Sequence, residues 1–141
     1  MRRGLLATAG LAALLLLLAG CGGSKKSETA ESEGTQATIA GLTANDHGTK
    51  QVGEDAEVEL DDFYFDPTVL KGKPGAQVTL ELKNEGSTEH NFSIDAQNID
   101  QDVDEGKSAT VTVTIPQSGE VSFYCKYHKS MGMAGALAAS G

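Results

Sequence analysis

The chain has 141 residues, which is enough for one domain, and its formal net charge at pH 7 is −9. An acidic surface of this kind repels phosphate groups, so we expect no nucleic acid among its partners. Two cysteines allow one disulfide at most, which excludes a scaffold held together mainly by disulfides.

Residues 1–20 have the features of an export signal. Arg2 and Arg3 precede an apolar run at residues 5–18, and about 14 residues are fewer than the ~20 that a membrane-spanning helix needs. The run ends in Leu-Ala-Gly-Cys, which resembles the bacterial lipobox. This resemblance implies that Cys21 becomes the lipid-modified first residue of the mature protein. The alternative is an ordinary secretory signal that ends in cysteine by chance. We expect an extracytoplasmic protein anchored to the membrane by lipid, at the cell surface or in the periplasm.

Residues 21–53 are predicted to be the lipidated cysteine and a flexible polar tether. The stretch is rich in Gly, Ser, Thr, Ala, Lys and Glu, and it has too few large apolar side chains to bury a core. Ile39 and Leu42 are exceptions that could add an edge strand. His47 lies in the turn-like sequence Asn-Asp-His-Gly, where a solvated loop histidine is expected.

Residues 54–141 are predicted to form the folded domain, and its apolar residues alternate with polar ones. Each run spans four to seven residues and is bounded by Gly, Pro, Asn or Ser. The alternating apolar positions are Val58, Leu60, Phe63, Phe65, Val78, Leu80, Leu82, Phe92, Ile94, Val111, Val113, Ile115, Val121 and Phe123. Short strands at regular spacing predict an all-β antiparallel sandwich. Residues 95–107 are expected to be an acidic connection, and residues 135–139 a short closing strand.

Cys125 begins the segment that carries the most informative chemistry, Cys-Lys-Tyr-His-Lys-Ser-Met-Gly-Met. If Cys21 is acylated, Cys125 is a lone thiol in an oxidising compartment, where it is vulnerable unless something occupies it. His128 follows three residues later, and Met131 and Met133 follow His128. Thiolate, imidazole and thioether together favour copper, and two histidines, one cysteine and a weak axial methionine describe a blue-copper electron-transfer site.

The second histidine of such a site must come from elsewhere in the chain, where His47 and His90 are available. His90 lies at the start of a predicted strand, just after a loop. It can therefore share one end of a sandwich with the Cys125 segment, and we expect it to be the second imidazole.

The folded part resembles the cupredoxins, the small blue copper proteins of the plastocyanin and pseudoazurin type. The resemblance is carried by Phe65-Asp66-Pro67, Gly75, Val78, Asn84, His90-Asn91, Gly119, Phe123-Tyr124-Cys125 and the spacing Cys-x-x-His-x-x-x-x-Met. It implies a cupredoxin-like Greek-key β-sandwich of about seven or eight strands. It also implies that His90, Cys125, His128 and Met133 bind one copper ion that cycles between Cu(I) and Cu(II). The protein is then an electron carrier rather than an enzyme, and Asn91 joins the two ligand loops by hydrogen bonds.

Two positions depart from the family pattern. Tyr127 stands where the family often has proline between the loop cysteine and histidine, and Glu89 stands where proline often precedes the first histidine. The apolar docking surface of the family is therefore not transferred to this chain. Met133 is preferred to Met131 as axial ligand because a glycine and the last strand follow it at the family's distance.

Several other interpretations remain open at this stage. The Cys125 segment could be part of the ordinary packing of the domain. It could also be a zinc site, although methionine is a poor zinc ligand, or a Cys–His nucleophile, although no orienting partner is evident. A copper-binding lipoprotein for scavenging, delivery or resistance is the main alternative to an electron carrier. Lys126 and Lys129 flank His128 and could steer an acidic redox partner. We expect a monomer whose partners are membrane-associated redox proteins.

Overall fold

The computed structural model describes residues 34–141, and the predicted signal peptide and lipidation site at Cys21 lie outside the described residues. Strands β1 (Thr35–Ile39) and β2 (Leu42–Asp46) form an antiparallel hairpin, which is followed by β3 (Thr49–Gln51). The predicted tether, residues 21–53, therefore extends too far, because its second half is folded. Within the described residues, no helix is long and apolar enough to cross a bilayer.

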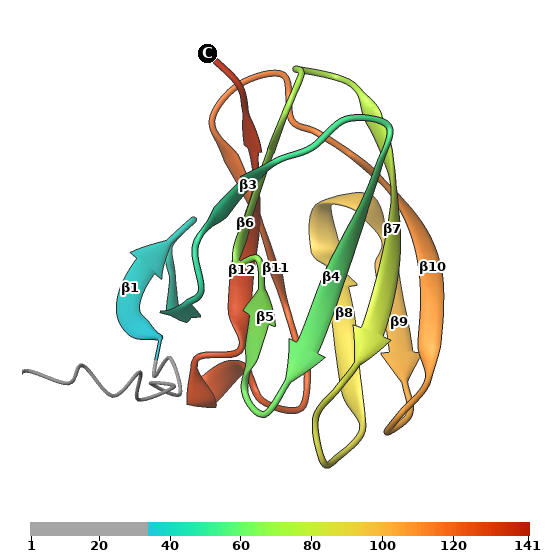
Figure 1. Cartoon of the computed structure of the whole chain (residues 1–141). Helices are drawn as coiled ribbons and strands as arrows, with labels where there is room; N and C mark the ends of the chain where they lie inside the picture. The colour runs from blue at the N-terminus through green and yellow to red at the C-terminus, as the bar shows by residue number, and fades with distance from the viewer. Residues whose placement is uncertain (1–33) are drawn as a thin grey trace, which may run out of the picture. The chain divides into compact units, whose positions relative to one another are not determined.

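Two sheets form the predicted β-sandwich (Figure 1), which confirms the fold class. One sheet has the order β10-β7-β4-β5 and the other the order β3-β6-β12-β11-β8-β9. The remaining strands are β4 (Asp55–Asp61), β5 (Tyr64–Asp66), β6 (Val69–Gly72), β7 (Gln77–Asn84), β8 (His90–Ile94), β9 (Ile99–Val103), β10 (Ser108–Thr114), β11 (Glu120–Tyr124) and β12 (Ala134–Ala139). Two short 3₁₀ helices, η1 (Asp95–Gln97) and η2 (Lys129–Met131), complete the described elements.

The sheets are mixed rather than purely antiparallel. The pairs β4–β7, β6–β12 and β3–β6 are parallel, and the other pairs are antiparallel. The chain crosses between the sheets, so neighbours in a sheet come from distant segments and can run in the same direction. The acidic connection predicted at residues 95–107 also contains η1 and the strand β9.

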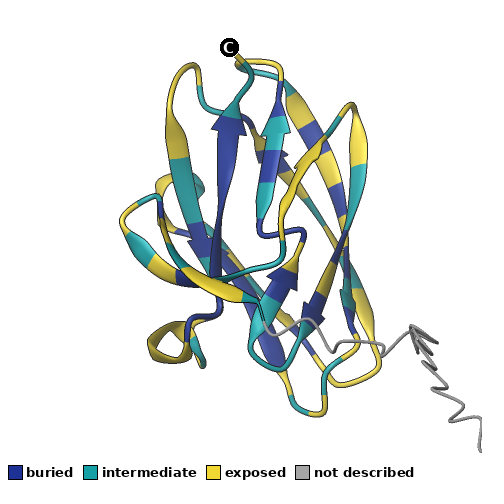
Figure 2. Ribbon diagram, turned by 60° about the vertical axis from the view of Figure 1, so that its left-hand side comes forward, coloured by how far each residue is buried: buried dark blue, intermediate teal, exposed yellow. Residues whose placement is uncertain are grey.

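The core lies between the two sheets and accounts for the period-two pattern (Figure 2). In β7, Val78, Leu80 and Leu82 are fully buried and alternate with exposed residues. Phe123 packs against Phe65 and Phe92, with ring centroids 5.0 Å and 4.8 Å away. At roughly 25 cal/mol per Å² of apolar surface, burial of such side chains is the main favourable contribution to folding.

The hairpin covers the outer face of β12, which explains why that strand is rich in small residues. Ile39 and Ala44 form a buried cluster with Ala134 and Ala136, whereas Leu137 faces the main core. A side chain at Gly135 would overlap the Thr68 carbonyl oxygen and lie 2.5 Å from the Phe123 ring. Glycine at this position therefore allows the close approach of backbone to core.

Three connections meet at the end of the sandwich away from the C-terminus: β4–β5, β7–β8 and the longer β11–β12 segment (Figure 1). They bring together residues near positions 62, 87 and 128. All the predicted ligands lie in or beside these connections.

Candidate metal centre

His90, Cys125 and His128 come together at this end of the sandwich. Their ligand atoms all lie within 4.8 Å of one another. The Nδ1 atoms of the two histidines are 3.2 Å apart, and Cys125 Sγ is 3.5 Å from His128 Nδ1. The three side chains therefore present two imidazole nitrogens and one sulfur to a common point.

The six-stranded sheet positions His90 and Cys125, and His128 lies in the connection that follows Cys125. His90 is the first residue of β8, Cys125 follows β11, and the two strands pair within the sheet. The Cys125 carbonyl accepts a hydrogen bond from His128 N–H at 3.2 Å, and Cys125 N–H donates to the Met133 carbonyl at 3.0 Å. These two bonds close the ligand loop, so the spacing in the sequence becomes a fixed geometry.

The two methionines of the loop differ sharply in exposure. Met133 is fully buried in the same core cluster as Cys125, whereas 48% of the Met131 surface is exposed. A thioether must be inside the protein to reach a buried metal. Burial therefore favours Met133 as the axial ligand, which remains a proposal.

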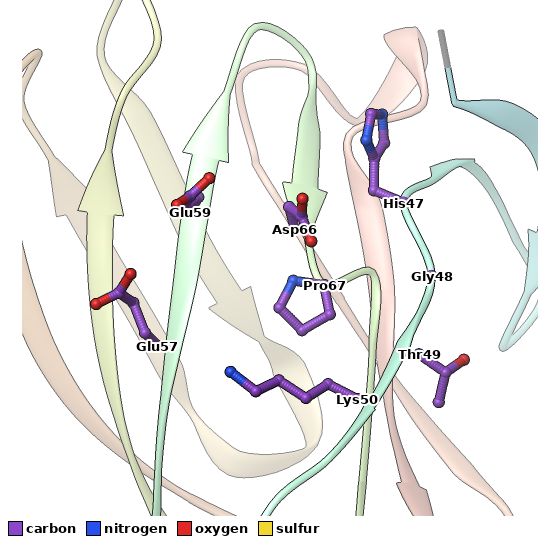
Figure 3. A pocket seen from close by; sticks show the side chains of 8 residues that line it. All are labelled: His47, Gly48, Thr49, Lys50, Glu57, Glu59, Asp66 and Pro67. Atoms are coloured by element: carbon purple, nitrogen blue, oxygen red, sulfur yellow. The ribbon is translucent and has the colours of Figure 1, made fainter. Parts of the chain in front are cut away.

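His47 lies apart from this cluster. Its ring stacks on Tyr64 with the centroids 3.6 Å apart, and its backbone N–H donates to Thr68 Oγ1 at 2.7 Å. It is thus more firmly held than a solvated loop histidine. A pocket of about 290 Å³ lies beside it and is lined by His47, Gly48, Thr49, Lys50, Glu57, Glu59, Asp66 and Pro67, whose side chains are drawn in Figure 3. None of the four proposed ligands lines this pocket.

Asp62 is a functional candidate that sequence reasoning did not identify. Its Oδ1 is 3.1 Å from His90 Nε2, the ring nitrogen that faces away from Cys125 and His128. Burial acts to raise the pKa of Asp62, but hydrogen bonds from Ser87 and His90 outweigh it and hold that pKa below its usual value. Asp62 is therefore an ionised acceptor near neutral pH. Nothing in its Asp-Asp-Phe sequence signals this role, because Ser87 and His90 lie 25 and 28 residues further along the chain.

The proton of His90 can be placed from this contact. Burial lowers the pKa of His90, although the hydrogen bond to Asp62 acts in the opposite direction. The ring is therefore neutral at pH 7 and carries one N–H. An ionised carboxylate can only accept, so the proton is on Nε2 and Nδ1 keeps its lone pair for a metal.

Asn91 joins the two ligand segments by hydrogen bonds, the role that the family resemblance implied. Its Oδ1 accepts hydrogen bonds from Lys126 N–H at 3.3 Å and from the Ser93 hydroxyl at 2.6 Å. Its Nδ2 donates to Asp100 and Asp102 at 2.7 and 2.8 Å. One buried amide thus links β8, β9 and the start of the ligand loop.

Asn45 holds the other end of the ligand loop and was also missed. Its Nδ2 donates to the carbonyls of Phe63 and Met131 at 3.0 and 2.9 Å. Its backbone N–H donates to the Gly132 carbonyl at 2.8 Å. The hairpin that contains Asn45 was assigned to the tether, so its sequence gave no reason to connect it with the site.

The two lysines beside His128 occupy different environments. The Lys126 ammonium lies 2.8 Å from both Asp100 and Asp102, and these carboxylates raise the pKa of Lys126 through hydrogen bonds. Lys129 lies over the Tyr124 ring, 4.0 Å from its centroid. The charge of Lys126 is therefore compensated locally.

The donor set and its surroundings fit one copper ion. His90 and Cys125 are fully buried, whereas His128 is partly exposed. Two imidazole nitrogens and a cysteine sulfur, with a buried thioether nearby, match the ligands of a blue-copper site. Structural zinc sites usually use four cysteine or histidine ligands, and only three such residues converge within the described part of the chain.

Comparison with solved structures agrees with the fold. Auracyanin from Roseiflexus castenholzii matches with 20% identity and a TM-score of 0.55, over 63% of this chain and 98% of its own. Auracyanin A from Chloroflexus aurantiacus, a blue copper protein, matches with 20% identity and a TM-score of 0.52, over 64% of this chain and all of its own. A heme-copper terminal oxidase structure matches with 17% identity and a TM-score of 0.53, over 62% of this chain and 65% of its own. Identities this low establish similarity of fold only.

A search of curated protein sequences finds no match. A family model described as the cupredoxin-like domain matches residues 11–139. The match spans more than half of the chain and includes every residue that converges on the metal centre. The chain therefore belongs to the cupredoxin-like domain family.

Proposed function

We propose that this protein is a membrane-anchored electron carrier that holds one copper ion between His90, Cys125, His128 and Met133. The proposal is supported chiefly by one observation, the convergence of two Nδ1 atoms and one Sγ at a point shielded by the core. Copper, when bound, supplies a one-electron couple between Cu(I) and Cu(II). The remaining properties follow from how this chain holds its own side chains.

The protein contributes a fixed ligand geometry. His90 and Cys125 are attached to paired strands, and hydrogen bonds of Asn45 and Asn91 hold both ends of the ligand loop. Ligands fixed in this way move little when the charge at the site changes, which favours fast electron transfer. A copper chaperone would need the opposite property, an open site that releases its ion readily.

His128 links the site to solvent. It is the one partly exposed member of the three, and the Phe63 ring packs against it with centroids 4.8 Å apart. Tyr127 and Met131, beside it, are the exposed large apolar side chains of the described domain. A partner that docks over these residues reaches the edge of the imidazole without opening the core.

The visible and EPR spectra of residues 22–141 loaded with Cu(II) test the copper site. We expect an intense blue colour and a narrow copper hyperfine splitting, both lost in Cys125→Ser. A colourless or ordinary tetragonal spectrum in the unaltered protein contradicts the proposal. It leaves copper scavenging, delivery or resistance as the better account.

The lipid anchor rests on the sequence around Cys21 and has its own test. The full chain is expected to fractionate with membranes and to incorporate labelled fatty acid. Cys21→Ser should abolish both properties, whereas Cys125→Ser, which removes the other cysteine, should retain them. Equal fractionation of the two variants would contradict anchoring at Cys21.

We further propose that Lys129, more than Lys126, steers an anionic redox partner towards His128. Among residues 34–141, Lys129 forms no ion pair, whereas Lys126 is paired with two carboxylates. Hexacyanoferrate serves as an anionic probe in stopped-flow oxidation of the reduced protein. Lys129→Glu should slow the reaction at low salt more than Lys126→Glu does, and the difference should disappear at high salt. Equal rates for both variants at low salt would contradict the proposal.

A further inference from the structure

The carboxylate of Asp62 lies directly behind the buried imidazole of His90. Nδ1 of this ring is directed towards the other ligands, 3.2 Å from His128 Nδ1, and Nε2 is 3.1 Å from Asp62 Oδ1. The His90 side chain is fully buried, and the Asp62 side chain is 29% exposed. The contact is therefore largely shielded from water. Electrostatic interactions in such a shielded place are stronger than at the surface.

Asp62 is itself held in place from the β7–β8 connection. Ser87 N–H lies 3.0 and 3.1 Å from the two carboxylate oxygens, and the Ser87 hydroxyl donates to Oδ2. The carboxylate is thus fixed by two donors on one side and presents Oδ1 to the histidine on the other. This arrangement orients the acceptor rather than leaving it free to rotate into solvent.

Gly86 makes room for this contact. A Cβ at this position would lie 2.5 Å from both Asp62 Oδ1 and His90 Nε2. Such a side chain would separate the carboxylate from the imidazole. The loop therefore combines a residue that leaves space, Gly86, with one that holds the carboxylate, Ser87.

We propose that Asp62 is a positioning residue that fixes His90 with Nδ1 towards the metal and lowers the reduction potential of the bound copper. The inference rests on the proposed function, because it assigns a role towards a copper ion at that site. The oxidised ion carries one more positive charge than the reduced ion. A nearby fixed negative charge therefore stabilises Cu(II) relative to Cu(I). A carboxylate that accepts the far N–H of a ligand histidine also makes the imidazole a stronger donor.

The test compares reduction potentials of the copper-loaded protein, residues 22–141. Asp62→Asn keeps the shape and an oxygen acceptor for Nε2–H but removes the negative charge. Glu85→Gln is the matched control, since it removes one charge from an exposed residue of the β7–β8 connection. We expect Asp62→Asn to shift the Cu(II)/Cu(I) preference tenfold or more towards Cu(I), a rise of about 59 mV per tenfold change. A shift no larger than that of Glu85→Gln would overturn the role in setting the potential.

Ser87→Ala provides a second variant in case Asp62→Asn folds poorly. It leaves the charge of Asp62 in place but removes the hydroxyl that holds it. We expect a smaller shift in the same direction. An unchanged potential in Ser87→Ala would overturn the view that the orientation of the carboxylate contributes.

The positioning of His90 is measured separately, without copper. In ¹⁵N NMR of the metal-free protein, we expect a neutral His90 ring with its proton on Nε2 and a shift of the proton away from Nε2 in Asp62→Ala. The same tautomer distribution in both proteins would overturn the positioning role. Failure of the proposed function can be distinguished from failure of this inference. If the proposed function is wrong, the unaltered copper-loaded protein has no blue spectrum, whereas the NMR result for the metal-free protein is unaffected.

Discussion

Replacement of Asn45 by alanine tests whether the N-terminal hairpin stabilises the ligand loop. The side-chain amide donates to the carbonyls of Phe63 and Met131 at 3.0 and 2.9 Å, and alanine removes both bonds. The backbone bond to Gly132 does not depend on the side chain and should persist. A hydrogen bond contributes about 0.5–1.5 kcal/mol net. The bond to Phe63 is partly buried and the bond to Met131 is exposed, so loss of both predicts a decrease of roughly 1–2 kcal/mol in the free energy of unfolding.

Guanidinium denaturation of metal-free residues 22–141, followed by far-UV circular dichroism, measures this loss. Thr43→Ala is the control, because Thr43 lies on the same strand with an exposed side chain. The control should change stability by no more than about 0.5 kcal/mol. If Asn45→Ala differs from the control by less than that amount, water replaces both bonds, and the side chain of Asn45 does not stabilise the loop.

The other predictions concern the axial ligand, the space behind the buried histidine and one tyrosine. Met133→Leu should shift the Cu(II)/Cu(I) preference about tenfold, or ~59 mV for one electron, and change the visible spectrum, whereas the exposed Met131→Leu should do neither. Gly86→Ala should lower the free energy of unfolding, measured by thermal denaturation, by roughly 1–3 kcal/mol because its Cβ would overlap two side chains. Gly53→Ala is the control, because a Cβ at this position would have no atom within 4 Å, and its stability should be unchanged. Equal losses of stability in the two variants would refute the packing argument. Burial, followed by a hydrogen bond to a neighbouring carboxylate, raises the pKa of Tyr64 from 10.0 to about 12. Its phenol should thus remain protonated when the absorbance at 295 nm is titrated to pH 11, and the folded state should lose stability as pH rises from 10 to 12. If the tyrosine ionisation at the highest pH is still present in Tyr64→Phe, it does not belong to Tyr64.

The sandwich could be predicted from sequence because its signal is local. Alternation of apolar and polar residues, as in β7 and β10, reflects one face on the core and one in solvent, and turn residues separate the strands. The strands that depart from this rule, β8 and β12, are buried on both faces. For the N-terminal hairpin, the sequence indicated only that Ile39 and Leu42 could add an edge strand, because the hairpin has few large apolar residues and is stabilised by the small side chains of β12 that it covers.

The spacing of Cys125 and His128 likewise determined half of the candidate centre, since a tight loop after a strand necessarily places them together. Sequence also limited the second histidine to His47 or His90 and the thioether to Met131 or Met133. The tertiary structure brings His90, and not His47, beside Cys125 and His128, and it buries Met133 and exposes Met131. Only folding decides which side chains share an end of the sandwich and which are buried. The supporting contacts of Asp62 and Asn45 depend entirely on it, as their partners lie 18 to 86 residues away along the chain. The spacing of residues in the sequence determines only which side chains come together within a single loop. Contacts between separate loops form only after the two sheets have packed.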